Sequence, residues 1–244
     1  MQTRKFLCSA ALAVATICFF DACNVIGQNR IKGSGNVITE ERSIPPFHQL
    51  KVEGSMDVYL SQGPAKAAVI EAEDNIIPVI EILMEGDQLK VRYKRNTSVS
   101  THKDVKVYLT TPEVDELSLS GSGDLKMNGK FNAKQDIKLS LSGSGNIEGS
   151  INAPAVKAAI SGSGNMDLKG ETKDVSLSIA GSGNFDGDDL LAENVAVSIA
   201  GSGDASVHAS VKLDAKIAGS GDVKYKGNPQ ISSSVAGSGS VKKD

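Results

Sequence analysis

The sequence predicts an all-β fold, a right-handed parallel β-helix (a solenoid) of about 18–22 residues per coil with an N-terminal β-rich portion. The first observation is a tripeptide, Gly-Ser-Gly, that recurs at 121–123, 143–145, 162–164, 181–183, 201–203, 219–221 and 237–239. The second is that each copy follows a run of alternating apolar and small residues, typical of a strand with one buried face. A period near 20 residues indicates one stacked unit. It is also shorter than the roughly 30 residues of a strand–helix–strand unit.

A single repeat shows how the residues would be distributed within one coil. In VSLSIAGSGNFDGDDLLAEN, the side chains of Val175, Leu177 and Ile179 point to one side, and the intervening small residues point to the other. The Gly-Ser-Gly tripeptide then makes a tight turn, because glycine readily adopts the positive φ that such a turn requires. A polar Asn184 and an inward Phe185 follow the turn.

The residue after each Gly-Ser-Gly is always polar. These residues are Asp124, Asn146, Asn165, Asn184, Asp204, Asp222 and Ser240. Stacking the coils in register would align them into a ladder that shares hydrogen bonds between equivalent side chains. Mixing neutral and acidic rungs would limit the repulsion between stacked carboxylates.

A left-handed β-helix is the alternative, since an 18-residue coil also suits a hexapeptide repeat. Ile217, Val223, Pro229, Val235 and Val241 do lie six residues apart. Gaps of 19, 20 and 22 residues break this frame elsewhere, and proline is a poor core residue. We therefore expect the right-handed form.

Residues 47–118 are expected to form strands with one short helix. Two alternating runs flank a degenerate copy of the turn at 54–57, and a turn at 85–87 predicts a hairpin. The remaining expected elements are a strand at 67–72, a short helix beginning within 74–78 with Asn75 as its cap, a polar loop at 94–104, and a strand that ends before Pro112.

Residues 1–22 have the features of a lipoprotein signal peptide. A basic pair precedes an apolar run from Phe6 to Phe20, which is shorter than the ~20 residues that span a membrane. Ala22 and Cys23 then match the end of a lipobox, where bacterial lipoproteins are cleaved and lipidated on the cysteine. Phe20 and Asp21 depart from the leucine and small residue usual there, so plain secretion and a retained anchor are alternatives.

The expected domain organisation follows from this segment. Lipidated Cys23 and a polar tether would occupy 23–46, with an early Gly-Ser-Gly copy at 33–35, and the solenoid domain would occupy 47–240. Acyl chains on Cys23 would hold the protein at a membrane surface, since each buried methylene contributes ~0.8 kcal/mol. We expect an outer-membrane lipoprotein of the cell envelope, on the periplasmic face or the cell surface.

Composition narrows the classes of partner. The net charge is −3 with both signs interspersed, so no basic field would attract nucleic acid. All three cysteines lie within the first 23 residues, which gives the body no disulfide framework. A membrane, through the lipid, and an unidentified protein or glycan remain as partners.

The sequence predicts no catalytic, cofactor-binding or metal-binding residues. Residues 121–244 contain neither Arg nor Trp, whereas cleaving sugars requires paired carboxylates and a positioned acid or base. The strongest acidic cluster is Asp186, Asp188 and Asp189. We interpret it as a solvated turn between coils, with a Ca²⁺ site as the alternative.

A family resemblance rests on three segments: EGSMDVYLSQG, EGDQLKVRY, and the series of hydrophobic-Ser/Ala-Gly-Ser-Gly-Asn/Asp units. Over roughly 47–240 the chain resembles the head GIN domain family (DUF2807) of auto-transporter adhesins. The resemblance implies a right-handed parallel β-helix and a predicted lipoprotein of the Bacteroidetes type. It supplies no catalytic residues.

The expected function is therefore that of a non-enzymatic, lipid-anchored β-solenoid of the cell envelope, acting in adhesion or surface interaction with an unidentified ligand. Two alternatives are a polysaccharide-active enzyme of the pectate-lyase-like fold and an envelope scaffolding protein. Activity that depends on Asp186, Asp188 and Asp189 would favour the enzyme, and stable envelope partners would favour the scaffold.

Overall fold

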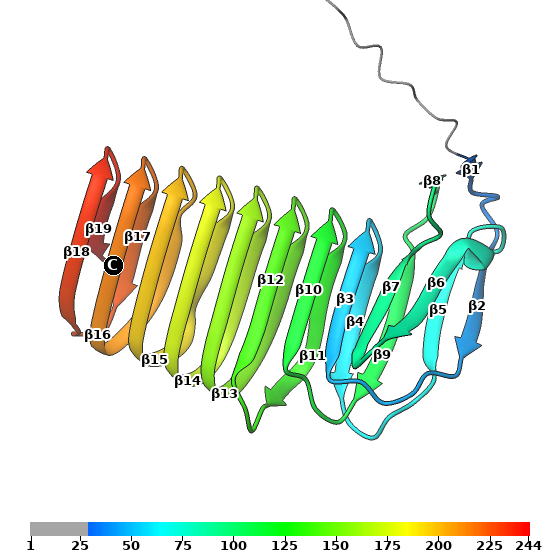
Figure 1. Cartoon of the computed structure of the whole chain (residues 1–244), viewed down its shortest axis with the longest axis horizontal. Coiled ribbons are helices and arrows are strands. Elements are labelled where there is room, and N and C mark those ends of the chain that lie inside the picture. Colours follow the sequence, from blue (N-terminus) through cyan, green and yellow to red (C-terminus); the bar gives the residue numbers. More distant parts are fainter. Residues whose placement is uncertain (1–28) are drawn as a thin grey trace, which may run out of the picture.

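The computed structural model describes residues 29–244, which form a stack of parallel coils (Figure 1). Seventeen strands belong to one continuous sheet, and β1 and β8 form a separate two-stranded sheet. In Figure 1 the chain rises through the near strands, crosses at the Gly-Ser-Gly turns and descends through the far strands, while successive coils advance to the left. This sense is right-handed, so the predicted all-β right-handed parallel β-helix is confirmed.

The repeats supply the C-terminal strands. These are β10 (Glu116–Gly121), β11 (Asp124–Asn132), β12 (Ile137–Gly143), β13 (Asn146–Gly162), β14 (Asn165–Gly181), β15 (Asn184–Gly201), β16 (Ala205–Gly219), β17 (Asp222–Lys226), β18 (Gln230–Gly237) and β19 (Ser240–Lys243). Strands β13 to β16 each run down one face of the solenoid, bend and rise along the other. We call the two halves of such a strand its descending and ascending parts.

Parallel pairing in register places equivalent residues of successive repeats side by side. Gly143 pairs with Gly162, Gly162 with Gly181, and Gly181 with Gly201. The alternation predicted from the sequence is confirmed: Val175, Leu177 and Ile179 are buried, and the small residues between them are exposed. The core is thus a column of aliphatic side chains between the two faces of the solenoid.

The Gly-Ser-Gly turns interlock from one coil to the next. The carbonyl of Gly143 accepts the N–H groups of Ser163 at 2.9 Å and Gly164 at 3.0 Å. Gly162 has φ +121°, and a Cβ on it would lie 2.4 Å from that same oxygen. A Cβ on Gly164 would lie 2.3 Å from the carbonyl oxygen of Gly145. Neither glycine leaves room for a side chain, because the backbones of consecutive turns are in contact.

The predicted polar ladder is also confirmed, and it extends one coil further, to Asp57. Its hydrogen bonds run from each rung to the preceding one. They are Asp124 N to Asp57 Oδ1 (3.1 Å), Asn146 Nδ2 to Asp124 Oδ1 (2.8 Å), Asn165 Nδ2 to Asn146 Oδ1 (3.1 Å), Asn184 Nδ2 to Asn165 Oδ1 (3.1 Å), Asp204 N to Asn184 Oδ1 (3.1 Å), Asp222 N to Asp204 Oδ1 (2.8 Å) and Ser240 Oγ to Asp222 Oδ1 (2.6 Å).

Asparagine and aspartate serve as rungs in different ways. The Asn184 side chain donates to the preceding rung, and its backbone N–H donates to the carbonyl of Gly164. An ionised carboxylate cannot donate, so Asp204 uses its backbone N–H for the ladder bond instead. Both residue types accept from the next coil, which keeps the ladder continuous.

The N-terminal strands complete the sheet. They are β1 (Asn29–Lys32), β2 (Val37–Arg42), β3 (Gln49–Gly54), β4 (Asp57–Gln62), β5 (Ala68–Glu73), β6 (Ile80–Glu85), β7 (Gln88–Tyr93), β8 (Thr97–Ser100) and β9 (Lys106–Thr111). The turn at 54–57 between β3 and β4 and the antiparallel β6–β7 hairpin are confirmed, as are the strands β5 and β9.

A short helix does begin within 74–78, as a single 3-10 turn, η1 (Ile77–Val79). Two expectations for this region are wrong. The N-cap of η1 is Ile76 and not Asn75. Asn75 instead uses its side chain to bind Ser34 and Lys32, which sequence alone did not place nearby. Strand β8 lies in the expected polar loop. β8 is stabilised by pairing with β1, a partner 68 positions earlier (Asn29↔Thr97, 97 − 29).

Ordered structure does not begin at Phe47. Strands β1 and β2 lie within the segment 23–46, for which the polar composition predicts a tether. β2 pairs antiparallel with β5, from Val37↔Glu73 to Arg42↔Ala68. This segment is polar because one edge and one side of it face solvent, and a polar strand at the end of a sheet is hard to distinguish from a linker by composition.

Replacing Gly164 with alanine is expected to lower the free energy of unfolding by roughly 1–3 kcal/mol, the usual effect of overpacking. The added Cβ would lie 2.3 Å from the Gly145 carbonyl oxygen and 2.8 Å from Leu141 Cδ2. Gly63→Ala is the control, since its Cβ would meet only Thr110 Cγ2 at 3.5 Å. Urea unfolding of both variants measures the difference. Equal stability of the two would contradict backbone contact between the turns.

Asp57→Asn is expected to stabilise the protein at pH 7 but not at pH 3. Burial raises the pKa of Asp57 above its ordinary 3.8, with the Asp124 and Asp104 carboxylates adding to the rise. The folded state thus binds the proton more tightly than the unfolded chain, so stability is highest below pH 3.8 and falls as the pH rises through the folded pKa. An asparagine Oδ1 can still accept from the Asp124 N–H.

The measurement for this variant is the free energy of unfolding between pH 3 and pH 7. Asp87→Asn, in the exposed β6–β7 turn, is the control for a general loss of negative charge. A parallel pH dependence in wild type and Asp57→Asn would show that Asp57 does not carry the effect.

Candidate functional site

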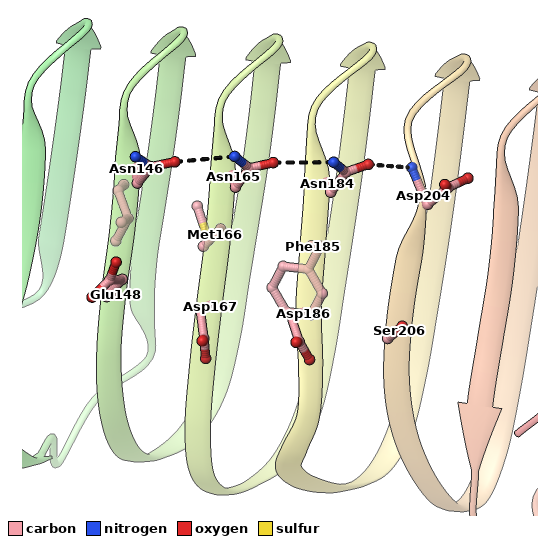
Figure 2. Close-up of a pocket in the computed structure, with 11 residues that line it drawn as sticks. Asn146, Glu148, Asn165, Met166, Asp167, Asn184, Phe185, Asp186, Asp204 and Ser206 are labelled. Atoms are coloured by element: carbon pink, nitrogen blue, oxygen red, sulfur yellow. Dashed lines mark hydrogen bonds between the residues drawn. The ribbon is translucent and has the colours of Figure 1, made fainter.

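A groove of about 430 Å³ runs across the descending parts of β13 to β16 (Figure 2). The ladder residues Asn146, Asn165, Asn184 and Asp204 form one wall. The other wall is a row two positions further along each strand, Glu148, Asp167, Asp186 and Ser206. The buried side chains of Ile147, Met166 and Phe185 lie beneath the groove.

The amide wall is held rigid by its own hydrogen bonds. Figure 2 shows the line of contacts from Asn146 through Asn165 and Asn184 to the backbone N–H of Asp204. Each of these three asparagines donates one N–H along the stack and accepts one bond. Since an amide has two N–H donors and two lone pairs, each keeps polar capacity for a molecule in the groove.

The carboxylate row is created by strand register. Glu148 pairs with Asp167, Asp167 with Asp186, and Asp186 with Ser206. Adjacent members therefore lie about 4.8 Å apart, the spacing of neighbouring strands. Glu148 and Asp186 are exposed, and Asp167 is half-buried.

One lysine borders the row at its N-terminal side. Lys126 lies in the preceding coil, with Nζ 3.9 Å from Glu148 Oε2 and 3.7 Å from Asp124 Oδ2. The Glu148 carboxylate, followed by Asp124, raises the pKa of Lys126. Within the described residues, Asp167 and Asp186 have no ion-pair partner within 4.0 Å. The groove is thus negative in its centre and neutralised at one end.

The three aspartates singled out from the sequence do not form one site. Asp186 lies in the groove wall, whereas Asp188 pairs with Lys226 at 3.0 Å, and Asp189 is exposed. The hydrogen bond to Asp188 is the main cause that raises the pKa of Lys226. Register in the β15–β16 pairing shifts between Gly187 and Leu191, so Asp188 and Asp189 do not continue the in-register row to which Asp186 belongs.

Sequence reasoning missed Glu148 and Asp167 because they are 19 residues apart (167 − 148) and each is isolated among neutral neighbours. The sequence does contain a pattern that identifies these two residues. In each repeat, the second residue after the ladder position faces outward, and aligning the repeats at Gly-Ser-Gly would have brought Glu148, Asp167 and Asp186 into one column.

Two further features concern chemistry and the membrane. In residues 29–244, no three His, Cys, Asp or Glu side chains gather closely enough to hold a metal ion. Over the same residues, every helical segment is too short or too polar to cross a membrane. Cys23 and the expected signal peptide, residues 1–22, lie outside the described residues.

Three solved structures of Bacteroidetes proteins have a similar fold. A putative adhesin from Bacteroides fragilis is 25% identical, with a TM-score of 0.81 over 88% of this chain and 100% of that one. A putative lipid binding protein from Parabacteroides distasonis is 28% identical, with a TM-score of 0.75 over 88% and 100%. A putative adhesin from Parabacteroides merdae is 24% identical, with a TM-score of 0.71 over 88% and 99%.

Among curated proteins, none matches the sequence. A family model does match, over residues 46–229, and its description is "Putative auto-transporter adhesin, head GIN domain" (DUF2807). The matched segment spans the N-terminal β-rich portion, the groove and most of the Gly-Ser-Gly coils, so the resemblance drawn from the three sequence segments is confirmed. The chain belongs to the head GIN domain family.

Proposed function

We propose that this protein is a non-enzymatic, lipid-anchored interaction protein of the cell envelope, and that the groove on its descending face binds the partner in adhesion. The observation that carries the proposal is the groove itself, in which two rows of polar side chains from four coils are held in register. Membership of a family described as adhesins supports the same function.

The geometry suits binding to an extended partner. Ladder bonds and core packing fix the groove walls before any partner arrives, so little conformational entropy is lost on binding. Amide and carboxylate groups repeated at about 4.8 Å can form hydrogen bonds to the hydroxyls of a glycan or the amides of a peptide. We propose a protein or glycan partner and no nucleic acid, since the groove is lined by carboxylates.

For the enzyme alternative, the candidate catalytic carboxylates are different from the three aspartates expected from the sequence. Asp186 lies in the groove wall while Asp188 pairs with Lys226, which leaves Asp167 and Asp186 as the two adjacent groove carboxylates that make no ion pair within the described residues. Retaining glycosidases need two carboxyl groups about 5 Å apart on either side of the bond that is cleaved. Both of these side chains instead stand in one row on one wall, which favours binding over cleavage.

Mutation of the groove is expected to weaken binding of the partner found by screening the protein against glycan, matrix and envelope-protein arrays. Asp167→Lys with Asp186→Lys would reverse the charge of the central wall, and we expect at least a tenfold loss of affinity. The matched control is Ser178→Lys with Ser198→Lys, which are paired and exposed on the ascending parts of the same two strands.

Two outcomes would contradict this assignment. Equal loss in the groove variant and the control would indicate a nonspecific charge effect, and unchanged binding in the groove variant would move the site elsewhere. Polysaccharide turnover abolished by Asp167→Asn with Asp186→Asn would establish the enzyme instead. Recovery of a stable complex with envelope proteins, unaffected by the groove variant, would establish the scaffold.

The lipid anchor predicts a specific labelling result. Cys23→Ser is expected to abolish incorporation of radiolabelled fatty acid into the protein, because serine leaves no thiol at residue 23 to carry an acyl chain. Cys18→Ser, within the apolar run, is the control and is expected to keep the label. Equal labelling of the two variants would contradict lipidation at Cys23. External protease applied to intact cells then distinguishes the surface from the periplasmic face.

A further inference from the structure

We infer that the early Gly-Ser-Gly-Asn copy, residues 33–36, is a clasp that fastens the N-terminal segment to the solenoid and can open without unfolding it. The clasp consists of this turn, the Glu73-Asp74-Asn75 segment after β5, and the backbone of His102. In the C-terminal repeats the same tripeptide stacks on the preceding coil. At residues 33–36 it instead donates hydrogen bonds to the side-chain carboxylates of Glu73 and Asp74.

The Glu73 carboxylate is the centre of the clasp. Its side chain is fully buried, with an exposed fraction of 0%. It accepts hydrogen bonds from the backbone N–H groups of Gly35 at 2.6 Å and His102 at 3.1 Å, and His102 Nδ1 lies 3.5 Å away. A buried carboxylate without such partners would be strongly destabilising. These contacts therefore join three distant parts of the chain through one group.

Gly33 is required by the position of that carboxylate. A Cβ on Gly33 would lie 1.9 Å from Glu73 Oε2 and 2.3 Å from Glu73 Cδ. Gly35 has φ +85° and no atom within 4 Å of its ideal Cβ position, so its role is to form the turn. The two glycines thus serve different needs, close approach to an anion and backbone conformation.

Asp74 and Asn75, the two residues after Glu73, complete the clasp with further hydrogen bonds. Asp74 accepts from Ser34 Oγ at 2.5 Å and from Asn36 Nδ2 at 3.0 Å, and these bonds, with Ser34 the larger contributor, lower the pKa of Asp74. Asn75 accepts from the Ser34 N–H at 3.0 Å and donates to the Lys32 carbonyl at 2.8 Å. Ser34, Gly35 and Asn36 therefore all form hydrogen bonds with one short segment, residues 73–75.

What the clasp holds has little stability of its own. β1 pairs only with β8, in a sheet of two four-residue strands that is separate from the large sheet. An isolated pair of strands is marginal in water, so its docking depends on the clasp and on a few contacts of Ile31 and Val99 with the core. By contrast, β14 and β15 are paired along most of their length. Residues 29–36 and residues 97–102, which include β8, should therefore open together as a local unit.

The consequence for the anchored protein rests on the proposed lipid anchor. When the clasp is closed, the solenoid is held from residue 29 onward, which restricts its orientation relative to the anchor. When it opens, eight residues (29–36) join the tether and add up to roughly 28 Å of reach. The clasp would then control how far the groove can extend from the membrane.

Hydrogen exchange of the full-length protein in detergent tests the clasp independently of lipidation and of any ligand. Glu73→Gln is expected to accelerate amide exchange at least tenfold in residues 30–36 and 97–102, with little change between 117 and 223. Glu71→Gln is the matched control. It lies two residues earlier on β5, where its partly exposed carboxylate is 3.6 Å from Lys106 Nζ, and it should leave both regions unchanged.

A second variant keeps the inference testable if Glu73→Gln fails to fold. Gly33→Ala disrupts the same contact from outside the solenoid and should produce the same local pattern, whereas Gly63→Ala should not. Unchanged exchange in 30–36 for the clasp variants would overturn the inference. Acceleration spread evenly through the strands between 117 and 223 would also overturn it, since Glu73 would then support the whole fold instead of a separable unit.

Discussion

Backbone contact between successive Gly-Ser-Gly turns is the constraint on which the rest of this structure depends. The carbonyl of the first glycine in one turn accepts one or two N–H groups from the next turn, as Gly143 does from Ser163 and Gly164. That oxygen would lie only 2.4 Å from a Cβ on the first glycine of the next turn, Gly162. The coils can approach this closely only because no side chain intervenes, and the approach fixes their register.

Once the register is fixed, it determines which outward-facing side chains of successive coils lie side by side. It aligns Asn146, Asn165 and Asn184 so that each amide donates to the one before, and it aligns Glu148, Asp167 and Asp186 two positions further on. A one-residue slip would turn these columns into the core and expose the aliphatic residues. The groove is therefore a product of the same contact that holds the coils together, which gives it walls that are rigid without dedicated supporting residues.

The two ends of the Gly-Ser-Gly series show how one tripeptide serves two physical purposes. Between coils, its glycines remove side chains where backbone meets backbone. At residues 33–36, Gly33 removes a side chain where backbone meets the buried Glu73 carboxylate. A repeated unit is stable because each copy has neighbours, whereas this copy has none of its kind and relies on polar contacts. This difference separates the part of the protein that must remain folded from the part that can open.

The repeat period, the alternation of apolar residues and the glycine turns determined the solenoid, its core and its ladder from sequence alone, because these features recur at fixed spacing and need no distant partner. The sequence also carried the family resemblance. Tertiary structure alone decided the contacts between residues that share no period. It showed that Asp186 belongs with Glu148 and Asp167 instead of Asp188 and Asp189, because strand register and a local insertion set the neighbours. It likewise placed 29–32 and 37–42 in strands and Asn75 beside Ser34, because pairing with segments 26 to 68 positions away (Arg42↔Ala68, 68 − 42; Asn29↔Thr97, 97 − 29) outweighs the polar composition that suggested a tether.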